Sequence, residues 1–232
     1  MKLVRGTDLL TTRMWDNRTS EQFPSSNFGK NDWNESSIQT FLTGDYYNRT
    51  GEAESNGLKL SARNMIDNAI FYLGGFPYSN SDTTYNVEKI YEMERGTETC
   101  VTTGVCSGGT RTTSWEGKVA LMYPSDMYIT YAKTDGVGCY NQPMSSIVCG
   151  STNVAKSWIY NTNKLERNSS YQLTRFLSHV SSDSIDVFHA ISGNLSNTFG
   201  SMAEGVRPVV YLSATVQIFD GDGSSENPYK LK

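Results

Sequence analysis

Apolar residues recur at helical spacing in two segments within the first third of the chain. In residues 31–42, an asparagine and an acidic first turn precede an apolar face that consists of Trp33, Ile38, Phe41 and Leu42. In residues 62–73, behind a Ser61 cap, the apolar stripe consists of Met65, Ile66, Ala69, Ile70 and Leu73. The sequence therefore predicts two amphipathic helices packed on the core, the first ended by Gly44 and the second by Gly74-Gly75.

Beyond residue 80 the pattern changes to short apolar runs separated by turn residues. These runs, like the one at residues 2–5, are typical of strands and lie at residues 118–123, 184–191, 205–212 and 215–219. Residues 87–93 fit either a strand or a short helix, and residues 220–225 contain the glycines of a hairpin turn. Helices followed by strands, without alternation of the two, predict an α+β fold. Without an internal repeat or a linker, we expect a single domain over residues 1–232.

Composition adds that the surface is polar but weakly charged. Hydrophobic residues make up 37% of the chain and charged residues 19%, while the 12% of aromatic residues argues against a disordered protein. The 20 basic residues are not clustered and face 24 acidic ones, which argues against a binder of nucleic-acid phosphates. No apolar run reaches the roughly 18 residues of a membrane-spanning helix. We therefore expect no membrane contact by this chain, and an anchor outside it, as in a trimmed ectodomain.

The four cysteines form two local couples, Cys100/Cys106 and Cys139/Cys149, each closing a loop rich in small polar residues. Neither couple has the C-x-x-C spacing of a zinc knuckle, and the chain has only two histidines. Two short-loop disulfides are the leading interpretation, which would place the protein in an oxidising, extracellular compartment. Unpaired thiols in a cytosolic protein and a metal site remain as alternatives.

Candidate catalytic and metal motifs find little support. The stretch Asp220-Gly-Asp222-Gly resembles a calcium loop but lacks the acidic spacing of an EF-hand, so we interpret it as a turn. There is no phosphate-binding loop or nucleophile elbow, and serine-protease chemistry would depend on His179 or His189. His189 lies in an expected strand, where a role on the sheet face is the default. We expect no cofactor and no enzymatic activity, although a pair of carboxylates acting on glycosidic bonds is not excluded.

The segment from Trp158 to Phe199 differs in composition from the rest of the chain. It combines Tyr, Ser, Asn and Gly with occasional Arg, His and Trp, the mixture typical of binding loops. Rigid aromatic side chains supply contact area at a low entropy cost, and Ser and Asn supply adaptable hydrogen bonds. A polar loop that simply faces water is the alternative interpretation.

Several stretches resemble a family of Gram-positive bacterial surface proteins. The most specific are Ser114-Trp-Glu-Gly-Lys-Val-Ala-Leu-Met-Tyr-Pro-Ser-Asp126 and Gly205-Val-Arg-Pro-Val-Val-Tyr-Leu-Ser213. Further matches lie, in order along the chain, at residues 2–5, 64–75, 94–96, 216–218, 221–224 and 227–229. The resemblance implies a C-type-lectin-like fold, of the branch shared with formylglycine-generating enzymes and the variable proteins of diversity-generating retroelements. We therefore expect two helices packed on short, mostly antiparallel strands with long loops.

In those variable proteins the ligand contacts lie just upstream of the strand that closes the core. By resemblance, the ligand-binding positions of this chain are Tyr160, Asn161, Asn163, Tyr171, Arg175, His179, Ser181, Asp183, Asn194, Asn197 and Phe199. The enzyme branch is not supported, because its paired cysteines lie late in the domain and this chain has none after Cys149. The calcium-and-sugar motif of animal lectins is also missing, since Gln142-Pro143-Met144 has the wrong third residue.

These inferences lead to two functional hypotheses. The leading one is a non-enzymatic domain for adhesion or ligand binding on the bacterial cell surface, with an unknown protein or glycan of another cell or a phage as its partner. In it Tyr160, Tyr171 and Phe199 are flat anchors, and Arg175 and Asp183 supply complementary charge. The alternative is a structural subunit of a pilus or surface fibre. Whether the gene is diversified by a retroelement is open.

Overall fold

The computed structural model describes residues 1–6, 9, 11–20, 23–77, 85–96, 112–127, 173–179, 185–191, 194–224 and 226–232. For residues 173–175, 178, 179, 191 and 194 only the main chain is described. Within this part the chain combines a few short helices with several small antiparallel sheets, which confirms the predicted α+β class.

The described strands are short and pair in five separate groups. They are β1 (Lys2–Val4), β2 (Arg13–Met14), β3 (Ala69–Tyr72), β4 (Ser114–Gly117), β5 (Val119–Leu121), β6 (Leu173–His179), β7 (Asp186–Ile191), β8 (Asn194–Phe199), β9 (Ala203–Glu204), β10 (Pro208–Tyr211), β11 (Ile218–Asp220) and β12 (Lys230–Leu231). Two sheets have three strands, in the orders β1-β10-β5 and β6-β7-β8. The pairs β2-β9, β3-β4 and β11-β12 complete the set, and every pairing is antiparallel.

The expected strands at residues 2–5, 118–123, 184–191 and 205–212 are confirmed as β1, β5, β7 and β10. The strand β10 lies between β1 and β5, so strands that are remote in sequence meet in one sheet. Its first two residues, Pro208 and Val209, are buried, as are all of β5. These apolar runs are short and bounded by turn residues, which favours a strand over a helix.

The first expected helix is present but begins later and continues further. The helix α1 (Ser37–Phe41) starts behind Ser36, whose hydroxyl accepts a hydrogen bond from the Gln39 amide. It runs directly into a π-helical turn, η1 (Leu42–Tyr46), so Gly44 does not end it. The predicted core residues Trp33, Ile38 and Leu42 are buried. The real cap is therefore a serine three residues beyond Trp33, and residues 31–36 approach the helix as an irregular segment.

The second expected helix, over residues 62–73, is wrong. Only one helical turn, α2 (Leu60–Arg63), precedes Asn64, and Ala69–Tyr72 form the strand β3 instead. Burial alternates there, because Phe71 is buried while its neighbours Ile70 and Tyr72 are 58% and 41% exposed. Pairing with β4 supplies partners for the main chain, and the ring of Trp115 on β4 lies 5.7 Å from that of Phe71. The apolar stripe has both helical and strand periods, and the tertiary pairing decides between them.

Residues 87–93, which fitted either a strand or a short helix, form the helix α3 (Val87–Glu94). Its N-cap is Asn86, whose side chain accepts a hydrogen bond from the Lys89 amide. Val87 and Ile90 on one side of the helix are fully buried, and Glu94 at its end is buried as well. A 3₁₀ turn, η2 (Gly51–Ala53), follows η1.

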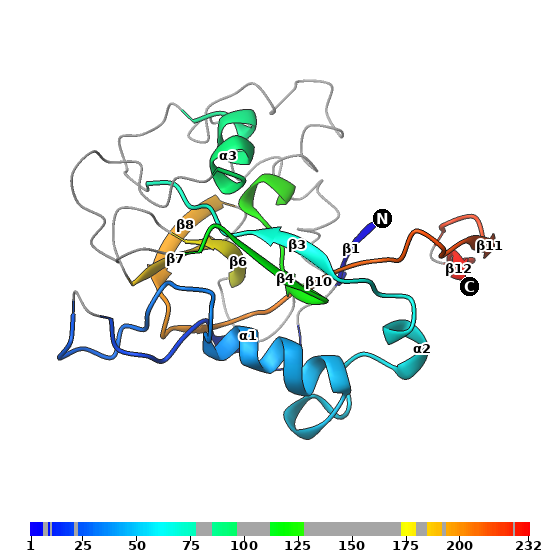
Figure 1. Ribbon diagram of the computed structural model, residues 1–232, viewed down its shortest axis with the longest axis horizontal. Helices are drawn as coiled ribbons and strands as arrows, with labels where there is room; N and C mark the ends of the chain where they lie inside the picture. The colour runs from blue at the N-terminus through cyan, green and yellow to red at the C-terminus, as the bar shows by residue number, and fades with distance from the viewer. Residues whose placement is uncertain are drawn as a thin grey trace.

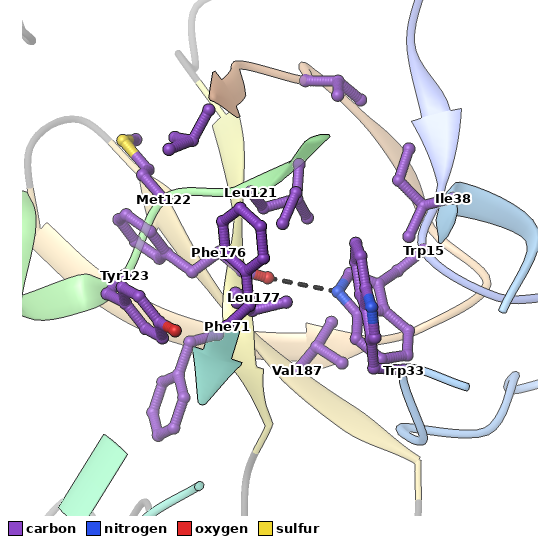
Figure 2. Close-up of a cluster of buried hydrophobic side chains, with 14 of the residues drawn as sticks. Trp15, Trp33, Ile38, Phe71, Leu121, Met122, Tyr123, Phe176, Leu177 and Val187 are labelled. Atoms are coloured by element: carbon purple, nitrogen blue, oxygen red, sulfur yellow. Dashed lines mark hydrogen bonds between the residues drawn. The ribbon is translucent and has the colours of Figure 1, made fainter. Parts of the chain in front are cut away.

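A chain of aromatic rings forms the centre of the core (Figure 2). Trp33 meets Trp15 and Trp115 edge to face, with ring centroids 5.8 and 5.7 Å apart. The indole Nε1–H of Trp15 donates to the main-chain oxygen of Phe176 on β6 over 3.1 Å, which satisfies its polar atom in the interior. The core therefore joins the segment before α1 to β4 and to the sheet β6-β7-β8.

The hairpin β11-β12 lies apart from the other sheets, at the C-terminal end of the chain (Figure 1). Its turn contains Gly221 and Gly223 in the left-handed region, which confirms the predicted hairpin turn at residues 220–225, although its first strand begins at Ile218 rather than Thr215. Three large apolar side chains remain more than half exposed on it: Ile218, Phe219 and Tyr229. An isolated two-stranded hairpin is only marginally stable in water.

Candidate functional site

The structure places only part of the predicted ligand-contact set. Outside the described residues lie Tyr160, Asn161, Asn163, Tyr171, Ser181 and Asp183, as do Cys100, Cys106, Cys139 and Cys149. Arg175 and His179 lie on β6 and Asn194 on β8, where the main chain alone is described. Asn197 and Phe199 lie on β8 with described side chains, two residues apart on this edge strand of the sheet β6-β7-β8.

Asn197 and Phe199 belong to a polar and aromatic corner at the end of β8. The ring of Phe199 stacks on that of Phe28, with centroids 4.3 Å apart and planes inclined by 23°, and Phe28 meets Phe23 edge to face at 5.9 Å. The Asn197 amide donates to the carboxylate of Asp186, the residue that pairs with Phe199 across the sheet. We call these five residues the Phe199 corner. Phe199 itself is 38% exposed, so part of its side chain reaches solvent.

The loop that carries Phe28 is held against the end of β8 by its main chain. Ser201 N–H donates to the Phe28 oxygen over 2.9 Å, and the buried Asn31 amide donates to the Asp186 oxygen over 2.8 Å. Gly29 has φ +85°, and a Cβ there would lie 2.6 Å from the Asp16 oxygen. Only glycine fits such a close, left-handed approach without strain. The corner is thus built on fixed main-chain contacts.

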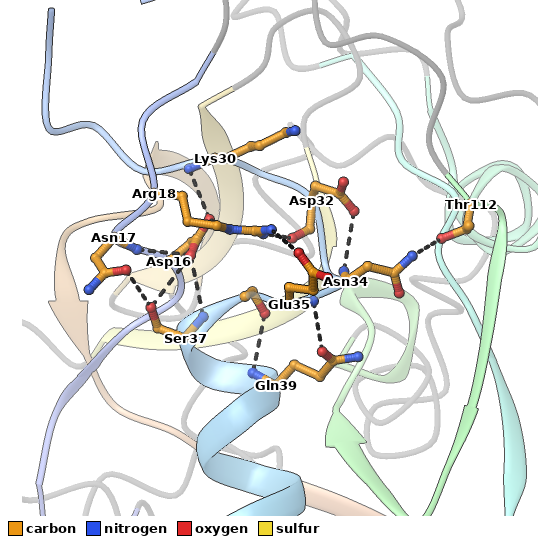
Figure 3. A network of polar contacts seen from close by, with 11 residues as sticks. Asp16, Asn17, Arg18, Lys30, Asp32, Asn34, Glu35, Ser37, Gln39 and Thr112 are labelled. Carbon is orange, nitrogen blue, oxygen red and sulfur yellow. Dashed lines mark hydrogen bonds and ion pairs between the residues drawn. The ribbon is translucent and has the colours of Figure 1, made fainter. Parts of the chain in front are cut away.

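A buried carboxylate, Asp16, connects this loop to the start of α1 (Figure 3). Its Oδ2 accepts from Arg18 Nε over 2.7 Å and from the Lys30 amide over 3.3 Å. Its Oδ1 accepts from the amides of Asn17 and Ser37, over 2.9 and 3.3 Å. A carboxylate that is buried away from water needs several hydrogen-bond donors to offset its lost hydration. Because these donors come from different segments, Asp16 holds those segments together. Asp16 therefore positions the corner and the helix relative to one another.

A groove beside α1 has a free volume of about 470 Å³. It is lined by Arg13, Glu35, Ser37, Thr40, Phe41, Gly44, Asp45 and Glu52. The guanidinium of Arg13 lies 3.9 Å above the ring of Phe41 and pairs with the carboxylate of Glu52. We call it the α1 groove. Sequence patterns do not predict this groove, because its sides come from β2, α1, η1 and η2, and no local pattern joins Arg13 to Phe41.

Of the two histidines considered as a general base, His189 is inaccessible. His189 on β7 is 6% exposed, and its Nδ1 lies 2.8 Å from Oε1 of Glu204 on β9, which is also buried. The pair joins the sheet β6-β7-β8 to β9, so it acts as an internal link between two sheets. A substrate would have to displace core residues to reach it.

A second buried carboxylate, Glu94, lies where α3 ends. Both its oxygens accept hydrogen bonds from Ser125, one from the amide over 2.9 Å and one from the hydroxyl, and Arg95 Nη1 lies 3.2 Å away. Burial raises the pKa of Glu94 to about 7, against the lowering effect of the Ser125 hydrogen bonds. Glu94 and Ser125 lie in two of the stretches that carry the family resemblance, residues 94–96 and 114–126. Their spacing in sequence gave no reason to join them.

Two cations lie over tyrosine rings near the end of α3. Arg95 lies over the ring of Tyr91 at 3.5 Å and over that of Tyr123 at 4.8 Å, and Lys2 lies over Tyr123 from β1 at the same distance. The phenol of Tyr123 donates to the Tyr72 oxygen over 2.9 Å, and burial raises the pKa of Tyr123 well above its usual value. Each of these ionisable groups is engaged in an internal contact.

Among known proteins, no family model, no curated protein and no solved structure matches the chain. Within the described ranges, no group of three or more His, Cys, Asp or Glu side chains is placed to hold a metal ion. None of the described helices is long and apolar enough to span a bilayer.

Proposed function

We propose that this chain is a non-enzymatic, extracellular ligand-binding or adhesion domain, and that its binding surface includes the Phe199 corner. The observation that carries the proposal is the stack of the partly exposed Phe199 on Phe28, beside the Asn197–Asp186 hydrogen bond. Rigid aromatic anchors flanked by hydrogen-bonding side chains are the usual centres of binding energy in recognition surfaces.

The fold that we propose is C-type-lectin-like, in the branch of the retroelement variable proteins and of the Gram-positive surface family that the sequence resembles. In support, β10, from the motif at residues 205–213, lies in the middle of a sheet between strands from the start and the centre of the chain. The binding segment then precedes this strand in sequence and ends on an edge strand. The partner would be a protein or glycan on another cell or a phage, and the cysteine couples would form disulfides in that compartment.

The non-enzymatic part of the proposal is supported by the internal contacts that the buried ionisable groups make. His189 is engaged with Glu204, Glu94 with Ser125, and Asp16 with Arg18. The first two pairs each link two structural elements, whereas Asp16 and Arg18 pair within one segment. None of these residues lines the α1 groove. Such pairs stabilise or specify a fold rather than activate a substrate.

The proposal is tested by screening the purified domain against a printed glycan array and against intact bacterial and epithelial cells. We expect binding to at least one target, and at least a tenfold loss of it in an Asn197→Ala, Phe199→Ala double variant. Phe219→Ala is the matched control, because Phe219 is also an exposed aromatic residue on a strand but lies on the distant hairpin. Equal binding by the double variant and the control would reject the Phe199 corner as the binding surface.

A second candidate function, a structural subunit of a pilus or surface fibre, is favoured by one observation. The hairpin β11-β12 carries Ile218, Phe219 and Tyr229 exposed on a unit that stands apart from the core. Exposed apolar clusters of this kind often mark protein–protein contacts. Concentration-dependent assembly in light scattering that Phe219→Ala abolishes would support the fibre, whereas a monomer at all concentrations would support adhesion.

A further inference from the structure

The α1 groove is an open groove with the volume of a small binding site, and it lies outside the surface proposed above. Its free volume of about 470 Å³ falls within the roughly 300–1,000 Å³ of typical ligand pockets. Its charges are unequal, since one arginine faces three carboxylates, those of Glu35, Asp45 and Glu52. The single arginine is already paired with Glu52, so the groove keeps an excess of negative charge.

The groove already holds one guanidinium in a defined position. Arg13 lies 3.9 Å above the Phe41 ring, pairs with Glu52, and donates from Nη2 to the Thr11 hydroxyl over 3.3 Å. Its side chain is only 17% exposed. Aromatic faces and carboxylates together are what a guanidinium or ammonium group requires when it leaves water. The lining therefore has the chemistry of a cation site, of which Arg13 fills one part.

The carboxylate of Asp45 is held in place by hydrogen bonds from Thr50 and Glu52. Asp45 accepts from the Thr50 hydroxyl over 3.2 Å and from the Glu52 amide over 3.4 Å, at the level of the π-helical turn η1. Single π-helical turns are frequent at functional sites. Asp45 is thus oriented before any ligand arrives, which lowers the entropy cost of binding.

Glu35 adds a carboxylate at the rim from a strained position. Its φ is 62°, a conformation that glycine or asparagine adopts more easily, and its amide donates to the Gln39 side chain over 2.8 Å. The carboxylate itself is 90% exposed, with Arg18 no closer than 3.9 Å. Local stability gains little from a glutamate at this position, whereas a cation that enters the groove would gain a second anionic contact.

We propose that the α1 groove binds the lysine or arginine side chain of a peptide segment of a partner protein. The aliphatic stem would lie along Phe41 and Gly44, and the cationic head would reach Glu35 and Asp45. An amino sugar fits less well, because a sugar ring needs an open aromatic face and Arg13 covers one face of Phe41. The net charge of −4 would favour the approach of a basic segment.

The test is a titration by NMR or calorimetry at low ionic strength, with a lysine-rich decapeptide as the probe. A matched peptide with glutamine in place of every lysine is the negative control, and a chitosan hexamer represents the amino sugar. We expect the lysine peptide alone to bind, with an affinity that falls as salt is added. Tighter binding of chitosan, equal binding of the glutamine peptide, or no binding to the intact domain would overturn the proposal.

Variants locate the site. Glu35→Gln and Asp45→Asn are each expected to weaken binding of the lysine peptide by roughly three- to tenfold, the range of one partly exposed ion pair. The Glu35→Gln variant gives the decisive result, because its carboxylate is exposed and can be replaced without disturbing the fold. Glu88→Gln, an exposed glutamate on α3, is the matched control and should bind as the unchanged domain does. Unchanged affinity in Glu35→Gln would reject the groove. Phe199→Ala should leave peptide binding intact, which separates this site from the Phe199 corner.

Discussion

The ring of Phe199, at the end of an edge strand, stacks on the ring of Phe28, with centroids 4.3 Å apart. The two residues are 171 positions apart in sequence, and the loop of Phe28 reaches the strand only because Asp16, Gly29 and Ser201 hold its main chain. Phe199 is therefore a partly exposed ring supported by fixed main-chain contacts. A binding surface requires that combination, because an anchor that moves loses affinity to the entropy of ordering it.

Because Asp16 supports the Phe199 corner, removal of its charge is expected to lower the free energy of unfolding strongly. Asp16→Asn exchanges two accepting oxygens for one and leaves the Arg18 guanidinium without its carboxylate, so we expect a loss of about 2–4 kcal/mol in the free energy of unfolding. Urea denaturation measures it. Glu92→Gln, which removes the exposed ion pair with Lys89, should cost less than about 0.5 kcal/mol. Similar losses in the two variants would show that Asp16 is not a structural hub.

Glu94 predicts a specific dependence of stability on pH. Its pKa in the folded protein, about 7, is raised from an ordinary value of 4.5, so the folded state binds the proton more tightly than the unfolded state. The resulting stabilisation is fully present below about pH 4.5 and is lost as the pH rises through 7, by up to about 3 kcal/mol.

This contribution can be isolated by comparing variants at each pH. Glu94→Gln resembles the protonated acid and should lose the corresponding part of the pH dependence in urea denaturation between pH 4.5 and 8. Glu88→Gln on the same helix is exposed and should retain it. A Glu94→Gln variant with an unchanged pH profile would contradict burial as the cause of the raised pKa.

In the turn after β3, a single added methyl group is expected to lower the stability of the fold. A Cβ on Gly74 would lie 2.2 Å from the Met93 oxygen and 2.7 Å from the Glu94 oxygen, both main-chain atoms that cannot move aside. We expect Gly74→Ala to lower the free energy of unfolding by more than about 2 kcal/mol, or to prevent folding. Gly6→Ala, where a Cβ would meet nothing within 4 Å, serves as the control in thermal melts. Comparable melting temperatures in the two variants would contradict the packing of β3 against the end of α3.

The comparison of sequence with structure separates local from non-local information. The strands β5, β7 and β10 and the glycine hairpin were predictable, because short apolar runs and left-handed turns are local properties. The expected helix over residues 62–73 was wrong. Phe71 and Leu73 are buried and alternate with exposed residues, as in a strand, and this pattern is recognisable only once the partner strand β4 is known.

The same division holds for the candidate sites. Asn197 and Phe199 could be proposed from composition and resemblance, since both lie just upstream of the closing strand. Phe28, Asp16 and the α1 groove could not, because each depends on contacts between segments that are remote in sequence. Buried polar pairs such as Glu94–Ser125 are equally invisible until the fold brings their elements together.

The most direct test of the binding surface is hydroxyl-radical footprinting of the domain, free and bound to a target found on the array or on cells. Phe199 is 38% exposed in the free domain, so its oxidation can be measured before and after binding. The proposed function predicts at least threefold protection of Phe199 on binding, together with unchanged oxidation of Phe219 and Tyr229 on the distant hairpin. Protection confined to the hairpin, with Phe199 oxidised as in the free domain, would contradict it.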